Sequence, residues 1–181
     1  MKVTADLINK AGVAAINTYL ECAGAGFSED SVSERSLSAF MALQLHNLAG
    51  LHAIPEVPYT RMVDDLQMKI EEPARAQIVG LRADIGLYDS GQPVAVVELK
   101  ILSCGSDALF EFARDLRKGD PVSLSKRIRI YATALICQTV GRSLDDQKVW
   151  VEKGIGQPLR YSSTEPTSTG QNWQWCFGCT E

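Results

Sequence analysis

Two acidic residues and a lysine in the middle of the chain have the types and spacing of a catalytic metal site. Asp84 precedes the triplet Glu98-Leu99-Lys100, whose charges interrupt the apolar run 93–102 and therefore need partners. Two carboxylates that converge on one sheet face form a hard-oxygen site suited to Mg²⁺ or Mn²⁺, and the Leu99 carbonyl can add a ligand. The Lys100 ammonium can orient a water or stabilise charge on a phosphoryl oxygen. The chemistry indicated is phosphodiester hydrolysis.

Two strands joined by a tight turn must position these groups. Residues 78–88 alternate between apolar and polar, which predicts a strand, and Gly91 lies in the turn that follows. We expect a three-residue hairpin loop with Gly91 as its left-handed residue. That register places Asp84 opposite Val96 and diagonal to Glu98 on one face. A two-residue loop would separate Asp84 and Glu98 onto opposite faces.

Helices and further strands are indicated around this hairpin. A capping-box pair, Ser31 and Glu34, predicts the start of the second helix, and Gly50 predicts its end. Apolar periodicity predicts helices over 5–22, 31–48, 106–118 and 144–153. Residues 61–72 fit either a strand or a helix. The stretch 128–140 favours a buried central strand because it is apolar on both faces; 162–171 reads as a loop and 172–179 as a last strand or tail.

Composition limits the class of protein. The chain has 181 residues, which corresponds to about one domain. Its 18 Lys and Arg against 22 Asp and Glu give a net charge of -4, which argues against coating nucleic acid or anionic membrane by bulk charge. No apolar stretch approaches the ~20 residues of a membrane span. Asp6 and Lys10 argue against a secretory leader, and five scattered cysteines favour reduced thiols, so we expect a cytoplasmic protein.

The motif resembles the PD-(D/E)xK nuclease superfamily, the restriction-endonuclease-like proteins. Asp84 and Glu98-Leu99-Lys100 carry the resemblance, and Glu34 matches an acidic residue that often joins the metal site from the preceding helix. The resemblance implies an α/β fold with a mixed central sheet of about four to five strands flanked by helices. It implies Mg²⁺- or Mn²⁺-dependent cleavage of nucleic acid, with DNA as the expected substrate, and it admits a homodimer.

Under this resemblance each residue has an expected role. Asp84, Glu98, Glu34 and the Leu99 carbonyl would hold the metal, and Lys100 would orient water or stabilise charge. The expected organisation is an N-terminal helical extension over 1–30, a nuclease-like core over 31–160, and a C-terminal loop and strand over 161–181. The residue before Asp84 is alanine and not the family's proline.

The most basic part of the sequence follows the proposed site. A stretch from the end of one helix through the next loop could contact phosphates, or it could be a solvated surface. The candidate nucleic-acid-binding residues are Arg117, Lys118, Lys126, Arg127 and Arg129.

Other interpretations of the same residues stay open. Glu34 could serve only as a helix cap. Glu98 and Lys100 could form a structural ion pair within the sheet. The fold could also be a catalytically inactive nucleic-acid-binding or assembly module. Cys176 and Cys179 form a lone C-x-x-C pair, which lacks the second ligand pair that a structural zinc site needs.

Overall fold

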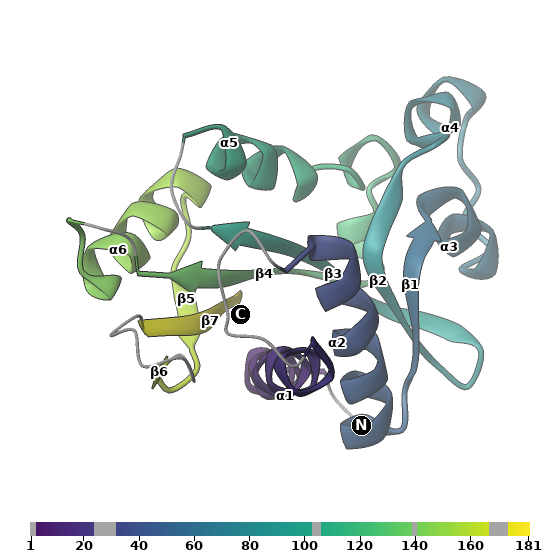
Figure 1. Cartoon of the computed structure of the whole chain (residues 1–181). Helices are drawn as coiled ribbons and strands as arrows, with labels where there is room; N and C mark the ends of the chain where they lie inside the picture. The colour runs from purple at the N-terminus through teal and green to yellow at the C-terminus, as the bar shows by residue number, and fades with distance from the viewer. Residues whose placement is uncertain (1–2, 24–31, 103–105, 139–140, 167–173) are drawn as a thin grey trace.

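A mixed seven-stranded sheet forms the centre of the structure, a computed structural model (Figure 1). It describes residues 3–23, 32–102, 106–138, 141–166 and 174–181. The helices are α1 (Ala5–Ala23), α2 (Glu34–Ala49), α3 (Tyr59–Asp65), α4 (Glu72–Ile78), α5 (Ser106–Asp115) and α6 (Leu144–Ile155), with short 3-10 turns η2 (Asp120–Val122) and η3 (Leu124–Lys126). The strands are β1 (His52–Pro58), β2 (Arg82–Asp89), β3 (Gln92–Leu102), β4 (Arg129–Cys137), β5 (Leu159–Tyr161), β6 (Glu165–Pro166) and β7 (Gln174–Thr180).

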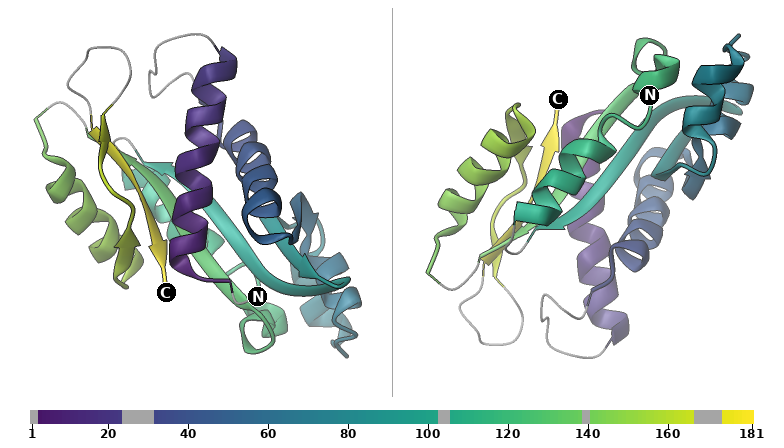
Figure 2. Two further views of the ribbon diagram at one scale, coloured as in Figure 1. Left: turned by 90° about the horizontal axis from the view of Figure 1, so that it is seen from below. Right: turned by 90° about the horizontal axis from the view of Figure 1, so that it is seen from above.

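The sheet is covered by helices on both faces. Its strand order is β1-β2-β3-β4-β7-β5, with β6 paired to β7. The β3–β4 pair is parallel, and the other pairs are antiparallel. Helices α1 and α2 lie on one face, and α5 and α6 lie on the other (Figures 1 and 2). The expected α/β fold with a flanked mixed sheet is confirmed, and the sheet is wider than the four to five strands expected.

Three groups of buried side chains hold these layers together. The largest lies between α1, α2 and the sheet, where Ile8 and Leu37 pack against residues such as Phe177. A second joins α3 and α4 to the β2–β3 end of the sheet. A third lies under α5 and α6 and includes Phe112 and Ala134. Neighbouring residues on a strand face opposite sides, so the burial of successive residues shows that β3 and β4 are covered on both faces. For the described part of the run 128–140, which forms β4, this confirms the predicted buried central strand.

The second helix begins later than the sequence suggested. Ser33, not Ser31, is its N-cap, and the Ser33 hydroxyl accepts a hydrogen bond from the Ser36 N–H. Glu34 is therefore the first helical residue and not the third residue of a capping box, so its carboxylate is free to reach the sheet. Residue 31 lies outside the described residues. Gly50 ends the helix at φ 64°, a conformation that suits glycine.

The β2–β3 hairpin corrects the expected register. Asp89 pairs with Gln92, so the loop has two residues, Ser90 and Gly91, both with positive φ (51° and 82°). A bulge between Leu87 and Tyr88 shifts the pairing so that Ile85 lies opposite Val97. Continuing this register by one pair places Asp84 opposite Glu98 and not opposite Val96. The bulge thus overturns the expectation that a two-residue loop would separate the two acids.

Two ambiguous segments are settled by the structure. Residues 61–72, which fit either period, are mostly helix and turn, with α3 and the start of α4 at their ends. Residues 174–180 form β7, which lies inside the sheet between β4 and β5. Helix α1 packs on β7, so the first and last elements of the described chain are neighbours (Figure 2). Among the described helices, none is long and apolar enough to cross a membrane.

Gly12 marks the close approach of α1 to β7 and gives a test of the fold. A Cβ at position 12 would lie 2.7 Å from the ring of Phe177, which is fully buried. We expect Gly12→Leu to lower the free energy of unfolding by about 1–3 kcal/mol through overpacking, although leucine favours helix. Urea denaturation measures the change. Asn17→Leu, at an exposed position of the same helix, is the control; equal stability of the two variants would contradict the packing.

Candidate active site

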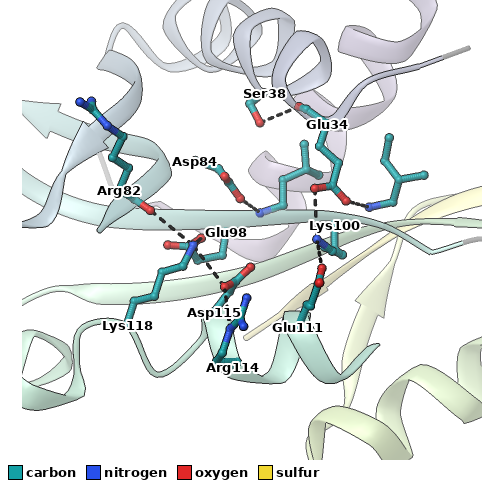
Figure 3. A network of polar contacts seen from close by, with 12 residues as sticks. Glu34, Ser38, Arg82, Asp84, Glu98, Lys100, Glu111, Arg114, Asp115 and Lys118 are labelled. Atoms are coloured by element: carbon teal, nitrogen blue, oxygen red, sulfur yellow. Dashed lines mark hydrogen bonds and ion pairs between the residues drawn. The ribbon is translucent and has the colours of Figure 1, made fainter. Parts of the chain in front are cut away.

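Four charged side chains meet where β2 separates from β3. The β2–β3 pairing ends at Ile85 and Val97, which leaves later N–H groups of β3 without a strand partner on that side. The Asp84 carboxylate accepts a hydrogen bond from the Leu99 N–H at 2.7 Å, and the Glu34 carboxylate accepts one from the Ile101 N–H at 3.1 Å. Two acids from separate elements therefore replace the missing strand. Figure 3 shows both against this edge of β3.

Glu98 projects from the same short stretch of β3 and is completely buried. Its Oε1 accepts a hydrogen bond from the Tyr59 hydroxyl at 2.7 Å, and its Oε2 lies 3.0 Å from the Lys118 ammonium. The neighbouring residue on β4 is Ala132, which is also completely buried. A buried carboxylate requires such partners.

Lys100 lies two residues beyond Glu98 and is held between two acids. Its ammonium is 3.3 Å from the Glu34 carboxylate and 3.1 Å from the Glu111 carboxylate (Figure 3). The Lys100 side chain is 13% exposed, whereas those of Glu34 and Glu111 are 38% and 48% exposed. Lys100 therefore lies at the border of the buried network and solvent, where a polar ligand could reach it.

The electrostatics show that negative charge is in surplus. Burial raises the pKa of Glu98 to about 8 despite the opposing effect of Lys118, and the charge of Asp84 adds to the rise. Burial also raises the pKa of Asp84, with smaller contributions from Asp115 and Glu34. For Lys118, burial disfavours the charge, but the nearby Glu98 outweighs it and the pKa is raised. Perturbed carboxylates of this kind often mark functional sites.

Helix α5 and the turn after it supply residues that the sequence pattern did not place in the site. Glu111 pairs with Lys100, while Asp115 and Lys118 pair with each other at 3.4 Å. The spacing of Glu111, Asp115 and Lys118 along the chain puts all three on one side of α5 and its following turn. The sequence shows this spacing, but it identifies site residues only once this side is known to face β3. Tyr59 was also missed, because its approach to Glu98 depends on how α3 packs under the sheet.

The structure divides the candidate nucleic-acid-binding residues into two groups. Lys118 points inward to Glu98 and is 19% exposed, so in this state it is not available to phosphates. The other four are exposed: Arg117, Lys126, Arg127 and Arg129. They follow α5 in the chain and lie on the segment leading into β4.

The cysteine pair has no metal-site geometry. Cys176 belongs to the buried group under α5 and α6, and Cys179 belongs to the group under α1 and α2. The two thiols therefore face opposite sides of β7 and cannot share one ion. Burial raises the pKa of both, so both stay protonated at neutral pH.

The donor set around β3 fits a divalent cation in its chemistry. Within the described part of the chain, no group of three or more His, Cys, Asp or Glu residues is already arranged around one point to hold a metal. The Asp84 and Glu98 carboxylates nonetheless oppose each other electrostatically, which a cation would relieve. Of the Asp84 oxygens, only Oδ2 is hydrogen-bonded among the described residues, so Oδ1 can accept a metal ion.

Comparisons with known proteins assign neither a family nor a function to the chain. No protein-family model matches the sequence, and neither the curated proteins nor the solved structures compared with it gave a match. Function is therefore inferred from the residues and geometry described above.

Proposed function

We propose that the protein is a divalent-metal-dependent nuclease of the restriction-endonuclease-like type, with DNA as its substrate and Mg²⁺ or Mn²⁺ as its cofactor. One observation carries the proposal. Asp84 and Glu34, from different elements, bind successive free N–H groups of β3 on either side of Lys100, beside the buried Glu98. Charged groups with perturbed pKa values that gather at one break in a sheet are candidates for a functional site.

In this proposal Asp84, Glu98 and the Leu99 carbonyl hold the metal, with Glu34 as an accessory acid. When bound, the ion would supply a water of lowered pKa and positive charge to offset that of the phosphoryl group. Lys100, which pairs with Glu34 and Glu111, would orient a water or stabilise the developing charge. The exposed arginines and Lys126 beyond α5 would contact the nucleic-acid backbone. The cysteines of the described residues are free thiols, which favours a cytoplasmic location. A homodimer would allow two strands to be cut.

A second candidate is a catalytically inactive module that binds nucleic acid or assembles with a partner. The observation that favours it is the closed state of Glu98, both of whose oxygens already have partners in Tyr59 and Lys118. If that arrangement is permanent, the acids serve stability alone.

Metal binding and cleavage assays distinguish the two candidates. We expect the wild-type protein to bind Mn²⁺ in calorimetric titration and to cut plasmid or linear DNA when Mg²⁺ or Mn²⁺ is present. An Asp84→Ala, Glu98→Ala double variant should do neither, provided that circular dichroism shows it is folded. Negligible binding in both proteins would remove the nuclease proposal. Metal binding by the wild type without cleavage of DNA or RNA would favour the inactive module.

A further inference from the structure

The Lys118 ammonium lies among oxygen atoms that would also suit a metal ion. Its Nζ is 3.0 Å from Glu98 Oε2, 3.4 Å from Asp115 Oδ1 and 3.4 Å from the Arg82 carbonyl oxygen. Two carboxylates and a carbonyl form the hard-oxygen environment that Mg²⁺ and Mn²⁺ prefer. The structure therefore already holds one cation beside Glu98, and that cation is tethered to the chain (Figure 3).

A second cation cannot bind Glu98 while the ammonium keeps this position. Tyr59 occupies Oε1 and Lys118 occupies Oε2, and the carboxylate has no exposed surface. A divalent ion on Oε2 would lie next to the ammonium, where repulsion between like charges is strong because the surroundings are buried. Lys118 can leave, since its side chain is 19% exposed and lies on the turn beyond α5, at the edge of the buried network.

We propose that Lys118 is a tethered counter-ion that competes with the divalent metal for Glu98. This inference rests on the proposed function, because it assigns Lys118 a role in setting the metal affinity of that same site. Without metal, the ammonium occupies the cation position between Glu98 and Asp115. Binding of a divalent ion releases Lys118 toward solvent, beside the exposed Arg117. The lysine thus positions Glu98 and sets the metal concentration at which the site fills.

Mn²⁺ titration of the full chain by calorimetry tests the competition without any activity measurement. Lys118→Met keeps most of the side-chain volume and removes the charge. We expect it to bind Mn²⁺ on the order of tenfold more tightly than the wild type. Lys148→Met is the matched control, because Lys148 is 21% exposed and pairs with Asp145 at 3.0 Å, away from the site. The control should bind Mn²⁺ as the wild type does.

A measurement on the wild type alone covers the case in which Lys118→Met does not fold. Acylation of lysine amines, read by mass spectrometry, should become faster at Lys118 when Mn²⁺ is added and should not change at Lys148. Equal Mn²⁺ affinity in the wild type and Lys118→Met, or unchanged labelling of Lys118 at saturating Mn²⁺, overturns the competition and leaves the proposed nuclease standing. Absence of Mn²⁺ binding in every protein overturns the proposed function itself.

Discussion

Lys100→Met is expected to lower the rate of DNA cleavage at least about 100-fold while leaving Mn²⁺ binding in place. Loss of one group that stabilises charge in a transition state typically has an effect of this size. The lysine is not a metal ligand in the proposed site, so the carboxylates of Asp84 and Glu98 should still bind the ion. Cleavage rates at saturating Mn²⁺ and calorimetric titration measure the two properties separately.

The variant is a fair test because the fold should survive it. Both partners of Lys100, Glu34 and Glu111, are more than a third exposed, so removing the ammonium leaves them in contact with water and not as buried unpaired charges. Lys148→Met, which removes a lysine of similar exposure on α6, should cleave at the wild-type rate. If Lys100→Met cleaves DNA at the wild-type rate, the lysine serves only to hold Glu34 and Glu111 together.

The sequence was most informative where charge breaks an apolar pattern. Glu98 and Lys100 interrupt a buried strand, and this interruption alone predicts that both have charged or polar partners. The two-residue period of β2 also identified Asp84. The predicted hairpin register was wrong because the loop has two residues and not three, and because a bulge at Leu87 and Tyr88 adds a residue that alternation alone cannot reveal. The shorter loop and the bulge each shift the pairing by one residue, so the paired residues of β2 and β3 keep the faces that the three-residue loop predicted.

The missing part of the site depends on packing between distant elements. Tyr59 reaches Glu98 across 39 residues, and Lys118 reaches it across 20. The apolar periodicity of α5 does predict which side packs on the sheet. It does not predict that Lys118, beyond the end of the helix, turns inward, and the basic stretch around Lys118 predicted phosphate binding instead. The place of β7 between β4 and β5 was also unpredictable, because strand pairing over long separations leaves no periodic signal.

The stability of the metal-free protein is expected to fall as the pH rises from about 5 to 8. Burial raises the pKa of Glu98 from 4.5 to about 8, so the folded protein binds more protons than the unfolded chain between these values. The free energy of unfolding therefore decreases as the pH rises across this window. The total decrease is a few kcal/mol at most, because each unit of difference between the folded and unfolded pKa corresponds to about 1.4 kcal/mol. The raised pKa of Asp84 acts in the same direction. The lowered pKa values of Glu111 and Asp146 matter only in more acidic solution.

Glu98→Gln isolates this effect, because glutamine resembles the protonated acid and does not titrate. We expect its free energy of unfolding to match the wild type near pH 5 and to exceed it near pH 8, in urea denaturation with a chelator present. In the control Glu21→Gln, at an exposed position, the free energy of unfolding should change with pH as it does in the wild type. If the free energy of unfolding of Glu98→Gln changes with pH as steeply as that of the wild type, Lys118 keeps Glu98 ionised throughout this pH range. In that case the pair is a permanent salt bridge, and burial does not govern the charge of the carboxylate.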